Sequence, residues 1–105
     1  MGRLHRRYGR AGRAGEIDQH MVDELDLYAE NESSLYNQKK SILANISRKI
    51  SSGKYDHKLA PKLWMYWVDA AARQYGHEFP GVKFNKATRE KLAHELADRY
   101  RSGEE

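Results

Sequence analysis

Apolar side chains recur at intervals of three and four residues along most of this chain, and this spacing limits its fold more than any other feature. An α-helix completes a turn in 3.6 residues, so such spacing places the apolar side chains on one face. Strand-like sequence is confined to the short fragment 82–84. We therefore predict an all-α fold, a small and mostly antiparallel bundle of about four helices with short connections.

The first two helices are predicted from their apolar stripes and from the residues at their ends. The first runs from residue 17 to about 30, where Asn31 and Ser33 offer a stop and a new N-cap. The second runs from about 34 to 51, and Gly53 follows as a C-terminal stop. The expected stripes are Ile17, Met21, Leu25 and Tyr28 in the first helix, and Leu35, Lys39 (at the edge), Ile42, Leu43, Ile46 and Ile50 in the second.

The third helix is apolar around most of its circumference, which predicts a central position covered by its neighbours. It starts either after Asp56, as an N-cap, or at Pro61, as a first-turn residue, and it ends at Gly76. Trp64 and Trp67 are its expected core anchors.

A last helix follows a loop over residues 77–84, in which Pro80 and Gly81 indicate a turn. Asn85 is its expected N-cap, and Ser102 and Gly103 its end. Its expected packing residues are Leu92, Ala93, Leu96, Ala97 and Tyr100.

Length and composition exclude several classes of protein. The 105 residues suffice for one domain, which we place at residues 16–105. The absence of cysteine excludes disulfides and thiolate metal sites, and no apolar run is long enough to span a membrane. The five histidines follow no metal-ligand spacing, and no catalytic motif is present. We therefore expect no metal, no cofactor, no membrane contact and no enzymatic activity.

Charge is strongly segregated along the chain. Residues 1–15 hold five arginines and no acid, and residues 16–32 hold seven acids and no lysine or arginine. Residues 33–62 then hold seven lysines and arginines against one acid. If the first two helices pack together, their opposite charges favour that pairing by a few tenths of a kcal/mol for each exposed pair.

The first 15 residues, here called the arm, are rich in glycine and carry only two sizeable apolar side chains, Leu4 and Tyr8. Such a segment is predicted to be disordered, because it buries too little surface to offset its ordering entropy. Arginine grips phosphate bidentately, so we predict non-specific nucleic-acid binding. Alternatively, the arm is a solubilising tail, or it lies on the acidic block that follows it. The arginines in question are Arg3, Arg6, Arg7, Arg10 and Arg13.

A second hypothesis is a protein-interaction module in which the arm is incidental. The acidic first helix, represented by Asp23 and Glu24, would then bind a host or virion protein. Aromatic residues of the third helix, above all Trp64 and Trp67, would otherwise form a surface for a partner or for self-association, although this spacing is more typical of a core.

One further pattern covers about half of the chain. Its residues are Glu30, Asn31, Leu35, Tyr36, Gly53, Tyr55, Asp56, Lys62, Leu63, Trp64, Tyr66, Val68 and Asp69. In these residues the chain resembles uncharacterised small helical proteins encoded by tailed bacteriophages. The Arg-rich arm is not part of that pattern, and Pro61 departs from it. The resemblance implies a viral context, a location in the host cytoplasm or the virion, and an accessory or virion-associated role.

Overall fold

The computed structural model describes residues 17–105, and these residues form four α-helices and no strand. The all-α prediction and the expected number of helices are confirmed. The predicted arm lies outside the described residues. The helices are α2 (Gln19–Asn31), α3 (Ser33–Ser51), α4 (Ala60–Glu78) and α5 (Lys86–Arg99).

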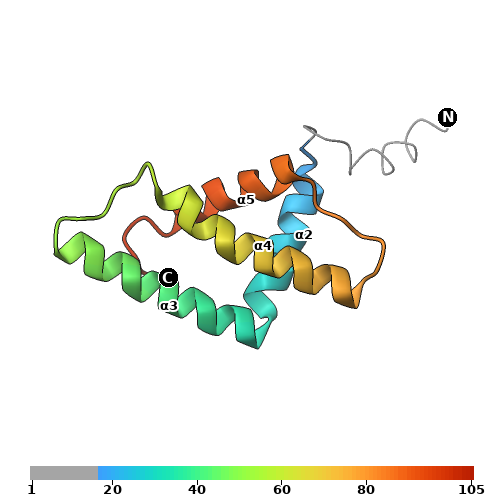
Figure 1. Cartoon of the computed structure of the whole chain (residues 1–105), viewed down its shortest axis with the longest axis horizontal. Helices are drawn as coiled ribbons and strands as arrows, with labels where there is room; N and C mark the ends of the chain where they lie inside the picture. The colour runs from blue at the N-terminus through green and yellow to red at the C-terminus, as the bar shows by residue number, and fades with distance from the viewer. Residues whose placement is uncertain (1–16) are drawn as a thin grey trace.

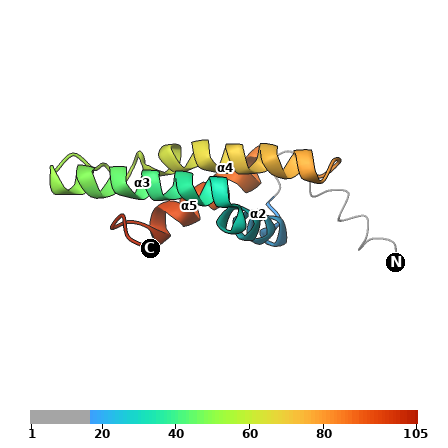
Figure 2. The ribbon, with the colours of Figure 1, turned by 90° about the horizontal axis from the view of Figure 1, so that it is seen from below.

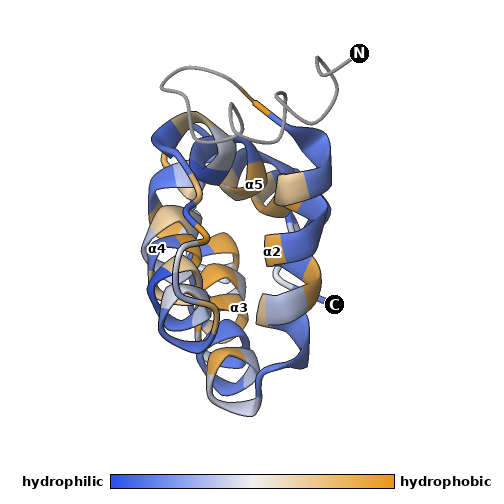
Figure 3. Ribbon diagram, turned by 90° about the vertical axis from the view of Figure 1, so that its right-hand side faces the viewer, coloured by the Kyte–Doolittle hydropathy of each residue, from blue (hydrophilic) through white to orange (hydrophobic). Residues whose placement is uncertain are grey.

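Three of the four helices are antiparallel neighbours, and the fourth crosses them. In Figure 1, α4 runs antiparallel to α3 on one side and to α5 on the other, whereas α2 crosses behind α4 at a steep angle. Figure 2 shows α2 and α5 on the same side of the layer that α3 and α4 form. In Figure 3 the apolar segments of the helices face the middle of the molecule. The bundle is therefore mostly antiparallel, as predicted.

The centre of the core is aromatic. The rings of Trp64 and Trp67 meet edge to face with their centroids 5.7 Å apart, and the Tyr100 ring lies 5.4 Å from that of Trp64. Trp67 Nε1 donates a hydrogen bond of 2.7 Å to the carbonyl of Leu35, which ties α4 to α3. Both tryptophans are buried, so their prediction as core anchors is confirmed.

The apolar face of α2 differs from the predicted stripe. Asp18 is the N-cap and accepts a hydrogen bond from the backbone N–H of His20. Ile17 therefore lies before the helix and is exposed. Met21 and Tyr28 are only half-buried, because the stripe is rotated toward the buried residues Val22, Leu25 and Ala29.

The start of α4 follows the second of the two predicted alternatives. Pro61 lies in the first turn, where its missing N–H costs no intrahelical hydrogen bond. Asp56 instead accepts a hydrogen bond from the N–H of Lys58 in the preceding turn. The helix continues past Gly76 to Glu78, so its predicted end was wrong.

The last helix begins as predicted, with the Asn85 side chain accepting a 2.8 Å hydrogen bond from the N–H of Thr88. It ends at Arg99, earlier than predicted. The chain then turns at Gly103, which is buried against α3, where its carbonyl accepts a hydrogen bond from Ser47 Oγ. The C-terminal residues are thereby brought beside α3.

Candidate functional site

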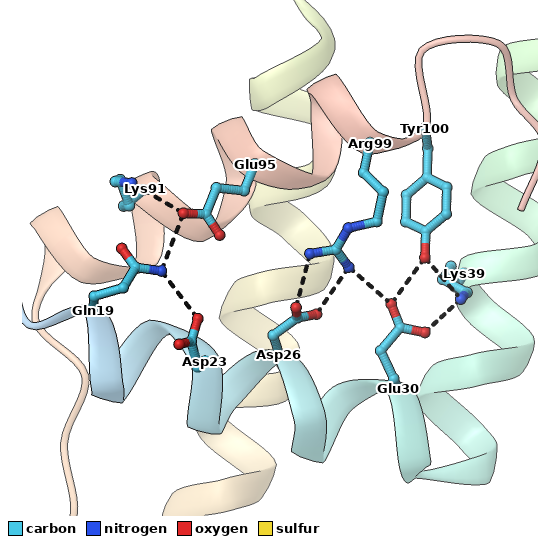
Figure 4. A network of polar contacts seen from close by, with 9 residues as sticks. All are labelled: Gln19, Asp23, Asp26, Glu30, Lys39, Lys91, Glu95, Arg99 and Tyr100. Atoms are coloured by element: carbon cyan, nitrogen blue, oxygen red, sulfur yellow. Dashed lines mark hydrogen bonds and ion pairs between the residues drawn. The ribbon is translucent and has the colours of Figure 1, made fainter.

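Two of the acidic residues of α2 are neutralised by a basic residue from the far end of the chain. Arg99 of α5 binds both carboxylate oxygens of Asp26, at 2.8 and 3.2 Å, and its Nη1 lies 3.4 Å from Glu30 (Figure 4). Because of the hydrogen bond to Asp26, the pKa of Arg99 is raised. The two-pronged geometry is the strong form of an arginine–carboxylate pair.

Lys39 of α3 completes this network from the other side (Figure 4). Its side-chain nitrogen contacts Glu30 at 2.5 Å, Glu105 at 2.9 Å and the Tyr100 hydroxyl at 3.3 Å. Burial alone would lower the pKa of Lys39, but these hydrogen bonds outweigh it and the pKa is raised. Lys39 is 2 % exposed, so it belongs to the buried stripe of α3 as predicted and is buried more deeply than a position at the edge of that stripe implies.

The predicted pairing of an acidic first helix with a basic second helix therefore holds at one contact, between Glu30 and Lys39. Asp26 turns toward α5 instead. The other basic residues of α3, namely Lys40, Arg48 and Lys49, form no ion pair with any carboxylate in residues 17–105.

Six of the nine lysines and arginines that have no carboxylate partner within residues 17–105 lie at one end of the molecule, here called the basic end. It combines the C-terminal part of α3, the loop after it and the first turn of α4, on the left in Figure 1. The C-terminal turn joins it, because Arg101 is close enough to lower the pKa of Tyr55, whose burial raises that pKa. The basic end consists of Arg48, Lys49, Lys54, Lys58, Lys62 and Arg101.

These six side chains are exposed, and in the described part of the chain none of them is in an ion pair. The single acid among residues 48–62 is Asp56, whose carboxylate already caps the N–H of Lys58. Arg48 and Lys49 also lie in the last turn of α3, where cations are favoured by the helix dipole. The basic end is thus a cationic surface with free hydrogen-bond donors.

Aromatic side chains lie within this surface. Tyr55 and His57 meet edge to face with centroids 4.7 Å apart. Lys49, Lys54 and Tyr55 line a shallow hollow whose apolar wall comes from the start of α4. The basic end can therefore offer an aromatic edge beside its cations.

The predicted site residues fall into three groups. The five arm arginines lie outside the described residues. Asp23 is exposed on α2 and accepts a 3.0 Å hydrogen bond from Gln19, and Glu24 accepts one of 3.2 Å from the Tyr75 hydroxyl. Trp64 and Trp67 are buried in the core and present no surface, so their interpretation as interaction residues was wrong.

Two absences concern residues 17–105 alone. No group of three or more histidine, aspartate or glutamate side chains there could hold a metal ion. No helix in that part of the chain has the length and apolar character needed to cross a membrane.

Sequence reasoning recognised the basic run but not the basic end. The excess of lysine and arginine over residues 33–62 was interpreted as a complement to the acids of α2. The sequence does hold a signal for the basic end, namely the position of these cations along the chain. Arg48, Lys49, Lys54 and Lys58 cluster around Gly53, where α3 stops, and are far along the chain from the acids of α2.

Comparison with known proteins finds no matching family model, no matching curated protein and no matching solved structure.

Proposed function

We propose that this chain is a non-enzymatic accessory protein that binds nucleic acid without sequence preference. The observation that carries the proposal is the basic end, where exposed cations have no carboxylate partner in the described residues. Unpaired lysines and arginines neutralise phosphates and release counterions, which is the main source of non-specific affinity. Contacts of this kind go to the phosphate backbone and do not read base identity.

The arm arginines belong to the same proposal. Arg3, Arg6, Arg7, Arg10 and Arg13 would add up to five phosphate contacts to those of the basic end. The exposed His57 ring beside Tyr55 supports a further contact, since aromatic side chains beside cations stack on exposed bases. A viral setting, in the host cytoplasm or the virion, is the context that the phage resemblance suggests.

The alternative, a protein-interaction module, has less support. Asp26 and Glu30 are held by Arg99 and Lys39 and offer little free charge to a partner. Trp64 and Trp67 are buried. What remains of this alternative is the exposed Asp23 and an apolar groove beside Glu24, since neither carboxylate has a lysine or arginine partner among residues 17–105.

The test is a salt titration of binding to a short duplex DNA and a structured RNA, followed by fluorescence anisotropy. The triple variant Lys49→Gln, Lys54→Gln, Lys58→Gln removes three charges from the basic end. If each lysine contacts one phosphate, the slope of log affinity against log salt becomes shallower by about 2–3, since each phosphate contributes about 0.9 on duplex DNA.

The matched control removes the same charge elsewhere. Lys83→Gln, Lys86→Gln, Lys91→Gln lies in and after the α4–α5 loop, where Lys86 and Lys91 already have glutamate partners. We expect a slope within about one unit of the parent. Equal effects of the two triple variants would mean that net charge alone matters and would reject the basic end as the site.

The same titration on a chain that starts at Ile17 reports on the arm. We expect weaker binding with a shallower slope, because up to five phosphate contacts are removed. Binding equal to that of the full chain would reject the role of the arm and leave the basic end unaffected.

A further inference from the structure

An apolar groove lies between α2 and the C-terminal end of α4, whose ribbons face each other in Figure 3. Its apolar side chains include Leu27, which is 62 % exposed, and Phe79, which is 48 % exposed. The Phe79 ring packs against the Tyr75 ring at a centroid distance of 4.8 Å and stays partly exposed to solvent. The groove is thus an apolar surface that the described residues leave uncovered.

The rim of this groove is acidic. Glu24 of α2 and Glu32, which follows α2, line the groove, and Glu78 is exposed in the last turn of α4. Unlike Asp26 and Glu30, none of these three carboxylates has a lysine or arginine partner among residues 17–105. A segment that binds in this groove therefore needs bulky apolar side chains to cover Leu27 and Phe79, and several cations to pair with the carboxylates at the rim.

We propose that the chain's own arm, residues 1–15, docks in this groove. The arm holds five arginines and no acid, which complements the rim. Its two bulky apolar residues, Leu4 and Tyr8, are four positions apart and suit an apolar floor formed by Leu27 and Phe79. The arm is therefore matched to the groove in both charge and apolar content.

The residues that connect Tyr8 to α2 are long enough, and begin close enough to the groove, for the arm to reach it. The arm joins the described chain just before α2, the helix that forms one wall of the groove. The eight residues between Tyr8 and Ile17 span up to about 26 Å when extended. From Gln19 to Asn31, α2 rises by only about 18 Å. Tyr8 can therefore reach the far end of the groove within the same molecule.

This inference does not depend on nucleic-acid binding, because it concerns where the arm rests in the free protein. If both proposals hold, phosphates compete with the acidic rim for the same arginines. Docking then lowers the affinity for nucleic acid and favours strongly polyanionic ligands.

The test uses the absence of cysteine from the chain. The double variant Gly9→Cys, Asn31→Cys leaves Leu4 and Tyr8 in place and puts one thiol in the arm and one on an exposed residue of the groove. Disulfide formation in the full chain is followed in a glutathione redox buffer by mass spectrometry. The control is Gly9→Cys, Tyr66→Cys, because Tyr66 is 78 % exposed on α4 and does not line the groove.

We expect the Asn31 pair to form an intramolecular disulfide at least ten times faster than the Tyr66 pair. Adding Glu24→Gln and Glu32→Gln should slow the Asn31 pair severalfold and leave the control unchanged. Equal rates for the two pairs would overturn the proposal. Disulfide-linked dimers in place of monomers would also overturn it, because the groove would then receive the arm of a second copy.

Discussion

At the scale of single residues, Lys39 is the side chain on which the packing of three segments depends. It joins α3 to Glu30 of α2 and, through Tyr100 and Glu105, to the C-terminal residues. All three of its N–H donors have acceptors, so the charge is buried without an unsatisfied group. A buried ion pair of this kind adds specificity of pairing, whereas losing one partner leaves the others desolvated.

Lys39→Met should lower the free energy of unfolding by about 1–3 kcal/mol, the usual penalty for a buried polar group that loses its partner. The lower part of that range is favoured because Glu30 keeps Arg99 and Tyr100 as donors. Urea titration at pH 7 measures the difference, with the exposed-site variant Lys40→Met as control.

This penalty should depend on pH in a defined direction. The pKa of Lys39 is raised in the folded protein above its ordinary value of 10.5. Its contribution is therefore fully present below pH 10.5 and is lost as the pH rises through the raised value. The parent and Lys39→Met should converge in stability above pH 10.5, and a gap that widens there would contradict the assignment.

No local pattern predicts the environment of Lys39. Its position in the stripe of α3 is visible in the sequence, and so is the length of its aliphatic stem. Its acceptors, however, come from residues 30, 100 and 105, and only the tertiary fold brings these together. For the same reason Arg99 was not recognised as the partner of Asp26, since 73 positions separate the two residues.

At the scale of elements, local chemistry decides where each helix stops. After α3 the N–H of Lys54 bonds to the carbonyl of Lys49, and the N–H of Gly53 to that of Ile50. This is the Schellman arrangement, and it needs a left-handed residue at Gly53, whose φ is 74°. The stop was predicted from the sequence because it depends only on neighbouring residues.

A pair of glycine substitutions should separate backbone strain from crowding. Both Gly53 and Gly103 have positive φ, so replacement by alanine costs each about 1–2 kcal/mol. A Cβ at Gly53 meets nothing within 4 Å, whereas at Gly103 it would lie 2.6 Å from Ser47 Oγ and 2.9 Å from the Ser47 backbone nitrogen.

Gly103→Ala should therefore be the more destabilising change, by a further 1–3 kcal/mol or so from overpacking. Denaturant titration of the two variants side by side measures the difference. Equal losses of stability would show that the C-terminal turn does not pack against α3 as described. Gly103 was expected to end the last helix, but its contact with α3 could not be predicted, because it joins residues 56 apart.

At the scale of the whole molecule, the central feature is which charged side chains form ion pairs and which stay unpaired. Asp26 and Glu30 of α2 are neutralised by Arg99 of α5 and by Lys39 (Figure 4), whereas Asp23 and Glu24 have no basic partner among residues 17–105. The basic end is left with an excess of cations. The number of helices in residues 17–105 follows from apolar periodicity, a local property, and was predicted correctly, although the ends of α4 and α5 were not. Which cations stay unpaired depends on the tertiary fold, so the sequence does not predict it. The unpaired cations of the basic end extend the candidate site from the arm alone to the arm and the basic end.

The most direct test of this account is an NMR titration of the ¹⁵N-labelled full chain with a short duplex DNA at low salt. We predict that the backbone amide signals of Arg48 to Lys62 and of Arg101 shift progressively as DNA is added, and that the shifts reverse at high salt. Amide signals over this stretch that stay in place while the protein binds DNA would contradict the account.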